Sequence, residues 1–110
     1  MGVEPSNDAE GCLQDVHWSM GAFGYFPTYT LGAMAAAQIF GAARAALPTL
    51  DVDLAGGNFE PLRQWLGSEV HAVGSLHATD DALLTAVTGR PLDPSVFLTY
   101  LEGKYRELYR

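Results

Sequence analysis

The chain has 110 residues, a length that fits one domain or part of one. Its thirteen acidic and six basic residues give a formal net charge of −7, which argues against sequence-independent DNA or RNA binding and against adsorption to anionic lipid. The hydrophobic fraction of 48% is enough for a core and argues against wholesale disorder.

The single cysteine, Cys12, excludes an intramolecular disulfide framework and any multi-cysteine zinc site. A reducing, cytoplasmic location is therefore expected. The N-terminus is acidic and lacks the basic and apolar regions of a signal peptide. The longest apolar stretch, residues 31–43, is interrupted by Gln38 and falls short of the roughly 20 residues that cross a bilayer, so no membrane association is expected.

The first half of the chain predicts a polar end, an aromatic loop and one long helix. Residues 1–11 are polar and are expected to form a flexible N-terminal segment. Residues 12–29 are dense in aromatic side chains and broken by Gly and Pro, which predicts a packed loop with short helical turns. A helix is predicted from Pro27 or Thr28 to about Ala46. Because small residues recur along it, neighbouring helices can approach closely, and it needs packing on more than one side.

The second half predicts a loop over residues 48–58 and then three further helices. These helices are expected over residues 60–73, from residue 79 or 80 to about 88, and from residue 94 to the end. Asn58 lies near the cap of the first of them, and Asp93 with Pro94 opens the last. No strand is predicted, so the expected fold class is all-α.

No sequence motif for autonomous metal chemistry is present. The chain contains no HExxH, no Cys-x-x-Cys and no Gly-rich phosphate loop. Two metal ligands on one helical face need a spacing of three or four residues, whereas His71 and His77 are six apart. His17, His71 and one acid could meet in space, but nothing in the sequence requires it, and we expect no metal ligand in this chain.

Residues 11–18 hold four side chains able to form hydrogen bonds, and two tyrosines follow closely. Asp15 and His17 can pair, which would fix the imidazole tautomer or raise its pKa. The tyrosines each combine an apolar ring with one directed hydroxyl. A binding or catalytic wall is one interpretation; the other is a loop whose polar groups satisfy buried backbone, with core aromatics behind it. The candidate site residues are Gln14, Asp15, His17, Trp18, Tyr25 and Tyr29.

In this order, these residues resemble the C-terminal end of the thermostable carboxypeptidase family, the Taq-type HExxH metallocarboxypeptidases. The resemblance covers the chain from about residue 11 to its end, with further family-like stretches at residues 19–32, 57–66, 70–74, 88–92 and 100–109. The family pattern G-x-x-Q-D-x-H-W matches Gly11, Gln14, Asp15, His17 and Trp18.

This resemblance implies a larger, largely helical fold with a deep substrate groove, in which residues 12–110 form the C-terminal part of the catalytic domain. The implied activity is the metal-dependent removal of single residues from peptide C-termini with broad specificity, often by a homodimer. In the family, zinc or cobalt is held by the two HExxH histidines and a downstream glutamate, and these ligands are missing from this chain. The six candidate residues would then line or brace the substrate groove.

Two functional hypotheses follow, and they leave open whether this chain is an enzyme. In the first, it is a fragment of a carboxypeptidase that supplies part of the groove wall and needs the missing N-terminal part of the fold for activity. In the alternative, it is a stand-alone, non-catalytic α-helical interaction module derived from such a peptidase. An independent hydrolase built on His17 and Asp15 would require activity that survives chelators and is lost in both His17→Ala and Asp15→Asn.

Overall fold

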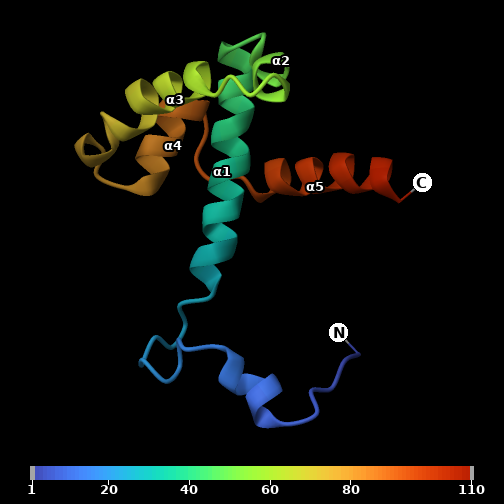
Figure 1. Ribbon diagram of the computed structural model, residues 1–110. Helices are drawn as coiled ribbons and strands as arrows, with labels where there is room; N and C mark the ends of the chain where they lie inside the picture. Colours follow the sequence, from blue (N-terminus) through green and yellow to red (C-terminus); the bar gives the residue numbers. More distant parts are fainter. Residues whose placement is uncertain (1, 110) are drawn as a thin grey trace. The chain divides into compact units, whose positions relative to one another are not determined.

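The computed structural model describes residues 2–109, and every regular element in that range is a helix or a helical turn (Figure 1). The expected all-α fold class is therefore confirmed. The chain divides into two compact units, one ending at Thr30 and the other beginning at Leu31. None of the helices within residues 2–109 is both long enough and apolar enough to span a membrane.

The first unit contains two short 3-10 helices, η1 (Asp8–Glu10) and η2 (Cys12–Gln14), followed by the aromatic loop. Local hydrogen bonds hold this loop: the Met20 N–H donates to the Val16 carbonyl over 3.0 Å, and the Ala22 N–H donates to the His17 carbonyl over 2.8 Å. The short helical turns that the sequence predicts are thus present. The predicted packing of the loop is wrong, because its large apolar side chains are exposed, with Trp18 at 63% and Phe23 at 73%. A boundary between a flexible segment and a domain after residue 11 stays a prediction.

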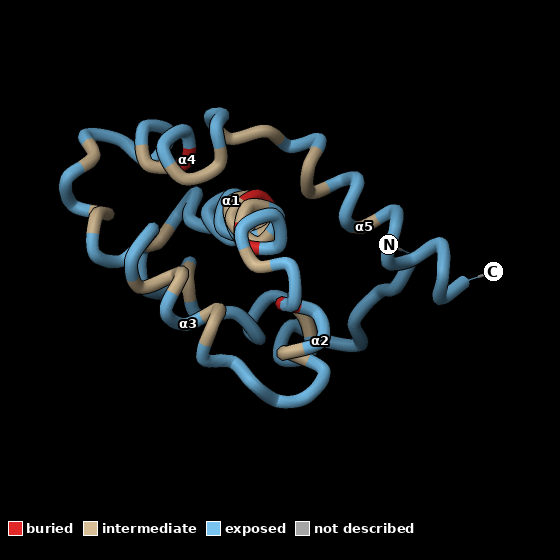
Figure 2. The backbone as a smooth tube through the Cα atoms, turned by 90° about the horizontal axis from the view of Figure 1, so that it is seen from above, coloured by how far each residue is buried: buried red, intermediate tan, exposed pale blue. Residues whose placement is uncertain are grey.

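The second unit holds most of the helical elements. They are α1 (Pro27–Ala46, which starts in the first unit), α2 (Leu50–Ala55), α3 (Glu60–Leu66), the π-helical η3 (Gly67–His71), η4 (Gly74–Leu76), α4 (Asp80–Thr88) and α5 (Pro94–Leu108). Both views show α2, α3 and α4 around the C-terminal half of α1 (Figures 1 and 2). Within the described residues, the buried apolar side chains are Ala43, Leu50 and Leu84, one each from α1, α2 and α4.

One sequence prediction about residues 48–73 was wrong. The predicted loop contains the helix α2, which forms because Leu50 is buried and the Thr49 hydroxyl donates to the Asp53 carboxylate over 2.8 Å. Asn58 lies near the cap of α3 as predicted, next to the N-cap residue Phe59, and its amide donates to Asp53 over 2.9 Å. The helix predicted over residues 60–73 changes from α to π geometry after Leu66.

The predicted starts of the last two helices and the predicted end of α4 are confirmed, whereas α5 ends at Leu108, before the end of the chain. The Thr79 hydroxyl accepts a hydrogen bond from the Ala82 N–H over 3.1 Å, and the Asp93 carboxylate accepts one from the Ser95 N–H over 2.9 Å. Gly89 follows α4 with a φ of 81°, in the left-handed region that glycine adopts without steric cost. These caps satisfy backbone groups that helix ends leave unpaired.

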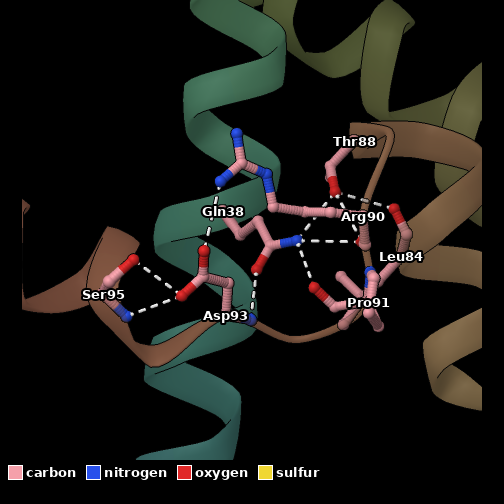
Figure 3. A network of polar contacts seen from close by, with 7 residues as sticks. All are labelled: Gln38, Leu84, Thr88, Arg90, Pro91, Asp93 and Ser95. Carbon is pink, nitrogen blue, oxygen red and sulfur yellow. Dashed lines mark hydrogen bonds and ion pairs between the residues drawn. The ribbon is translucent and has the colours of Figure 1, made fainter.

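Gln38 interrupts the apolar stretch of α1 because it connects α1 to the segment between α4 and α5 (Figure 3). Its side chain is buried, and its amide nitrogen donates to the Thr88 hydroxyl over 2.8 Å. The same nitrogen lies 3.1 Å from the Arg90 carbonyl oxygen and 3.0 Å from the Pro91 carbonyl oxygen. The Asp93 N–H donates to the Gln38 amide oxygen over 2.9 Å. One side chain thus satisfies several backbone groups and fixes the start of α5.

Candidate functional site

Asp15 and His17 pair in the first unit, as the sequence suggests. The His17 Nδ1 atom lies 2.9 Å from Asp15 Oδ1 and 3.1 Å from Oδ2. The His17 backbone N–H also donates to Asp15 Oδ1 over 2.8 Å. Because residue 17 follows residue 15 by two positions, the carboxylate of Asp15 forms an Asx-turn with the His17 N–H. This turn places the carboxylate beside the imidazole.

The pairing has a clear electrostatic effect on the carboxylate. The backbone N–H of His17 is the main cause that holds the pKa of Asp15 below its usual value of 3.8, and the His17 side chain adds to it. The ionised carboxylate favours a proton on Nδ1, so that the neutral imidazole presents the lone pair of Nε2 on its other edge. Asp15 therefore determines which edge of the His17 ring can accept a hydrogen bond.

Tyr29 occupies that other edge. Its hydroxyl lies 3.0 Å from His17 Nε2, which completes a chain of hydrogen bonds from Asp15 through His17 to Tyr29. Tyr29 stands in the first turn of α1, whose first residue is Pro27. Since the fixed φ of proline suits a first helical position, the start of this helix places the tyrosine against the imidazole.

Aromatic rings enclose His17 on its remaining sides. Tyr25 stacks on the imidazole with ring centroids 5.2 Å apart, and Phe26 tilts against it at 5.0 Å. The side chain of His17 is only 22% exposed, whereas that of Asp15 is 45% exposed. We call this set the His17 cluster: Asp15, His17, Tyr25, Phe26 and Tyr29.

The other two candidates lie outside the cluster. The Gln14 amide donates to the Ala9 carbonyl, a local contact within the first unit. Trp18 is 63% exposed and tilts against Phe23 with ring centroids 6.0 Å apart. The structure thus brings four of the six candidate residues together, and it adds Phe26, which the sequence analysis did not single out as a site residue. The only available signal for Phe26 was its place between Tyr25 and Tyr29.

The described residues do not form a metal centre. Within residues 2–109, no three His, Cys, Asp or Glu side chains lie close enough together to hold a metal ion. Asp15 and His17 supply two donors, and the edge of the imidazole that faces away from Asp15 is bonded to a tyrosine hydroxyl. The metal that a metallopeptidase fold implies therefore does not fit these residues.

Comparison with known proteins shows which family the chain belongs to. The family described as Carboxypeptidase Taq (M32) metallopeptidase matches residues 1–105 of the chain. The chain belongs to the M32 metallopeptidase family. It is 46% identical over 109 residues to thermostable carboxypeptidase 1 of Thermus thermophilus and 45% identical over 109 residues to carboxypeptidase 1 of Bacillus subtilis.

A solved M32 structure shares the fold of the chain. The crystal structure of the M32 carboxypeptidase from Deinococcus radiodurans R1 superposes with a TM-score of 0.87 at 41% identity, over 98% of this chain and 22% of that one. Each of the Thermus and Bacillus matches likewise covers 99% of this chain but only 21% and 22% of the relative. The chain therefore spans about one-fifth of the length of the M32 proteins that it matches, and it corresponds to a helical part of their larger fold.

Proposed function

We propose that this chain supplies part of the substrate-groove wall of a metal-dependent carboxypeptidase that removes single residues from peptide C-termini with broad specificity. The observation that carries the proposal is the hydrogen-bonded chain from Asp15 through His17 to Tyr29, in a segment that the M32 family matches. The described residues bring together side chains that can form hydrogen bonds with a peptide. They do not assemble a metal centre. The chain by itself is therefore proposed to be inactive.

The proposed role of the His17 cluster is to bind the peptide. Asp15 fixes the His17 tautomer, and Tyr29 holds the opposite edge of the ring in place. The Tyr25 ring stacks on the imidazole. Within residues 2–109 no hydrogen bond occupies its hydroxyl, which can donate to a peptide carbonyl or a terminal carboxylate. Tyr25 can stabilise an oxyanion with this hydroxyl once the rest of the groove positions the substrate, whereas both ring nitrogens of His17 are already hydrogen-bonded to Asp15 and Tyr29.

Other properties of the whole protein are proposed on the same basis. Zinc or cobalt would be held by residues outside the described part of this chain. The remaining part of the M32 fold is the expected partner, homodimers are expected, and nucleic acids and membranes are not expected partners. A cytoplasmic location fits the lone, exposed Cys12.

A chimera tests the proposal. The matching segment of Bacillus subtilis carboxypeptidase 1, which is 45% identical to this chain, is replaced by this chain, and kcat/KM is measured for release of the C-terminal residue of a peptide. The variant Asp15→Asn is expected to lower kcat/KM by about 10–100-fold, as for other carboxylates that orient a functional histidine. Tyr25→Phe is expected to lower it by removing one donor to the substrate.

The matched control is Asp8→Asn, which makes the same chemical change in η1, outside the His17 cluster. It is expected to leave kcat/KM unchanged, and circular dichroism checks that all variants are folded. Equal activity in Asp15→Asn and Asp8→Asn would place the His17 cluster outside the groove and contradict the proposal.

A further inference from the structure

An apolar groove lies within the second unit, away from the His17 cluster in the sequence. It has a volume of about 650 Å³ and is open to solvent. Side chains of α1, α3, η3 and α5 line it, among them Ala36, Phe40, Leu66, Val70 and Phe97. The lining residues that carry polar side-chain atoms are His71 and Tyr100.

The lining of the groove suits a segment of protein better than a small ligand. Small-molecule sites place several polar groups to orient the ligand, and this lining is almost entirely aliphatic and aromatic. The α1 wall carries Ala33, Ala36 and Ala37, small residues that let the backbone of a further helix approach closely. From Ala33 to Phe40 this wall extends about 10 Å, or two helical turns. Such a wall fits a helix with large apolar side chains at positions i, i+3 or i+4, and i+7.

The second unit also buries few of its apolar side chains. Its buried apolar side chains within the described residues are Ala43, Leu50 and Leu84, whereas Leu98 and Leu31 are 58% and 49% exposed. The M32 relatives have about four-fifths of their length outside the part that this chain matches. That additional length is enough to supply helices that would cover the unit.

We infer that the groove between α1, α3 and α5 binds the apolar face of a helix, and that this helix belongs to the part of the M32 fold that lies outside this chain. The inference rests on the proposed function, because it takes this chain as one part of a larger carboxypeptidase fold. A second copy of the chain is a poorer occupant: a symmetric contact would set one concave groove against another and leave a void between them, which protein interiors avoid.

Cysteine labelling in the Bacillus chimera tests the occupancy. In a Cys12→Ser background, Ala36→Cys lies in the groove and Ala45→Cys lies on α1 outside its lining. Both positions are exposed in the chain, so a charged maleimide is expected to label both at similar rates in the isolated chain. In the chimera, labelling of Ala36→Cys relative to Ala45→Cys is expected to slow by about 100-fold, because it requires local opening.

A photo-cross-link identifies the occupant. Tyr100 in the chimera is replaced by p-benzoylphenylalanine, which keeps an aromatic ring at the groove, and cross-linked peptides are mapped by mass spectrometry. A cross-link to host sequence outside this chain supports the inference. Cross-links between two copies, or an unchanged ratio of the two labelling rates, would overturn it. Neither the labelling nor the cross-link needs catalysis. A chimera in which Ala36→Cys is labelled slowly but which has no activity would therefore contradict only the proposed function.

Discussion

At the residue scale, the backbone contributes more than the imidazole to the state of Asp15. The His17 N–H is the main cause of the lowered pKa of this carboxyl, ahead of the hydrogen bond from the His17 ring. Because folding lowers the pKa, the ionised form stabilises the local fold above pH 3.8, and this contribution is lost as the pH falls through the lowered pKa.

An NMR titration of the Asp15 side-chain carboxyl carbon checks this order of causes. The midpoint is expected below 3.8 in the unmodified chain. In His17→Ala it is expected to rise only part of the way to 3.8, because the backbone donor remains. A midpoint at or above 3.8 in the unmodified chain, or a complete return to 3.8 in His17→Ala, would contradict the account.

Gln38 is the second residue whose environment leads to a prediction. In Gln38→Leu the Asp93 N–H loses its acceptor, and the Arg90 and Pro91 carbonyls lose a donor. We expect exchange of the Asp93 amide hydrogen to accelerate by about 5–150-fold, which corresponds to the roughly 1–3 kcal/mol cost of an unsatisfied buried group.

The matched control is Gln64→Leu, since Gln64 is exposed and its amide reaches only the neighbouring Glu60 carboxylate. Amide exchange at Asp93 is expected to stay unchanged in that variant. Equal exchange rates in Gln38→Leu and the unmodified chain would mean that Gln38 does not hold the start of α5.

The residue-scale predictions from the sequence succeeded where the partners are close along the chain. Asp15 and His17 are two positions apart, so local geometry was enough to expect their pairing. The partners of Gln38 lie fifty or more positions away, and periodicity carries no information on such contacts. Gln14 and Trp18, which the family pattern also groups with the site, lie outside the His17 cluster, and their place in the substrate groove stays a prediction.

At the element scale, helices with strong end signals were predictable and short ones were not. Pro27, Thr79 and Asp93 begin helices as expected, because each satisfies or tolerates the unpaired groups of a first turn. The six residues of α2 are too few to show a clear helical period, and the burial of Leu50 that stabilises this helix depends on tertiary packing. The π geometry after Leu66 likewise has no reliable sequence signal.

Alanine substitutions at two glycines are expected to change helix stability in opposite directions. Gly103 lies inside α5, and a methyl group there meets nothing within 4 Å, so Gly103→Ala is expected to stabilise α5 by about 0.5–1 kcal/mol. Gly89 has a φ of 81°, so Gly89→Ala is expected to destabilise the end of α4 by about 1–2 kcal/mol although space is available. Amide exchange within the two helices measures both effects. The same sign for the two variants would contradict this assignment.

At the scale of the whole molecule, the chain is one part of an M32 fold whose other parts it does not contain. The chain covers about one-fifth of its relatives, its second unit has few buried apolar side chains among the described residues, and the donors that residues 2–109 bring together do not make a metal centre. The G-x-x-Q-D-x-H-W pattern made the family predictable from the sequence. The apolar groove was not predictable, because it depends on how α1, α3 and α5 come together.

The most direct test of this account is a peptide-hydrolysis assay that compares the chain alone with the Bacillus chimera, each supplied with zinc or cobalt. Release of the C-terminal residue from a peptide is expected from the chimera and not from the chain alone. Release by the chain alone that persists in a chelator would show a complete active site within these residues. That result would contradict the proposal that this chain supplies one wall of a larger carboxypeptidase groove.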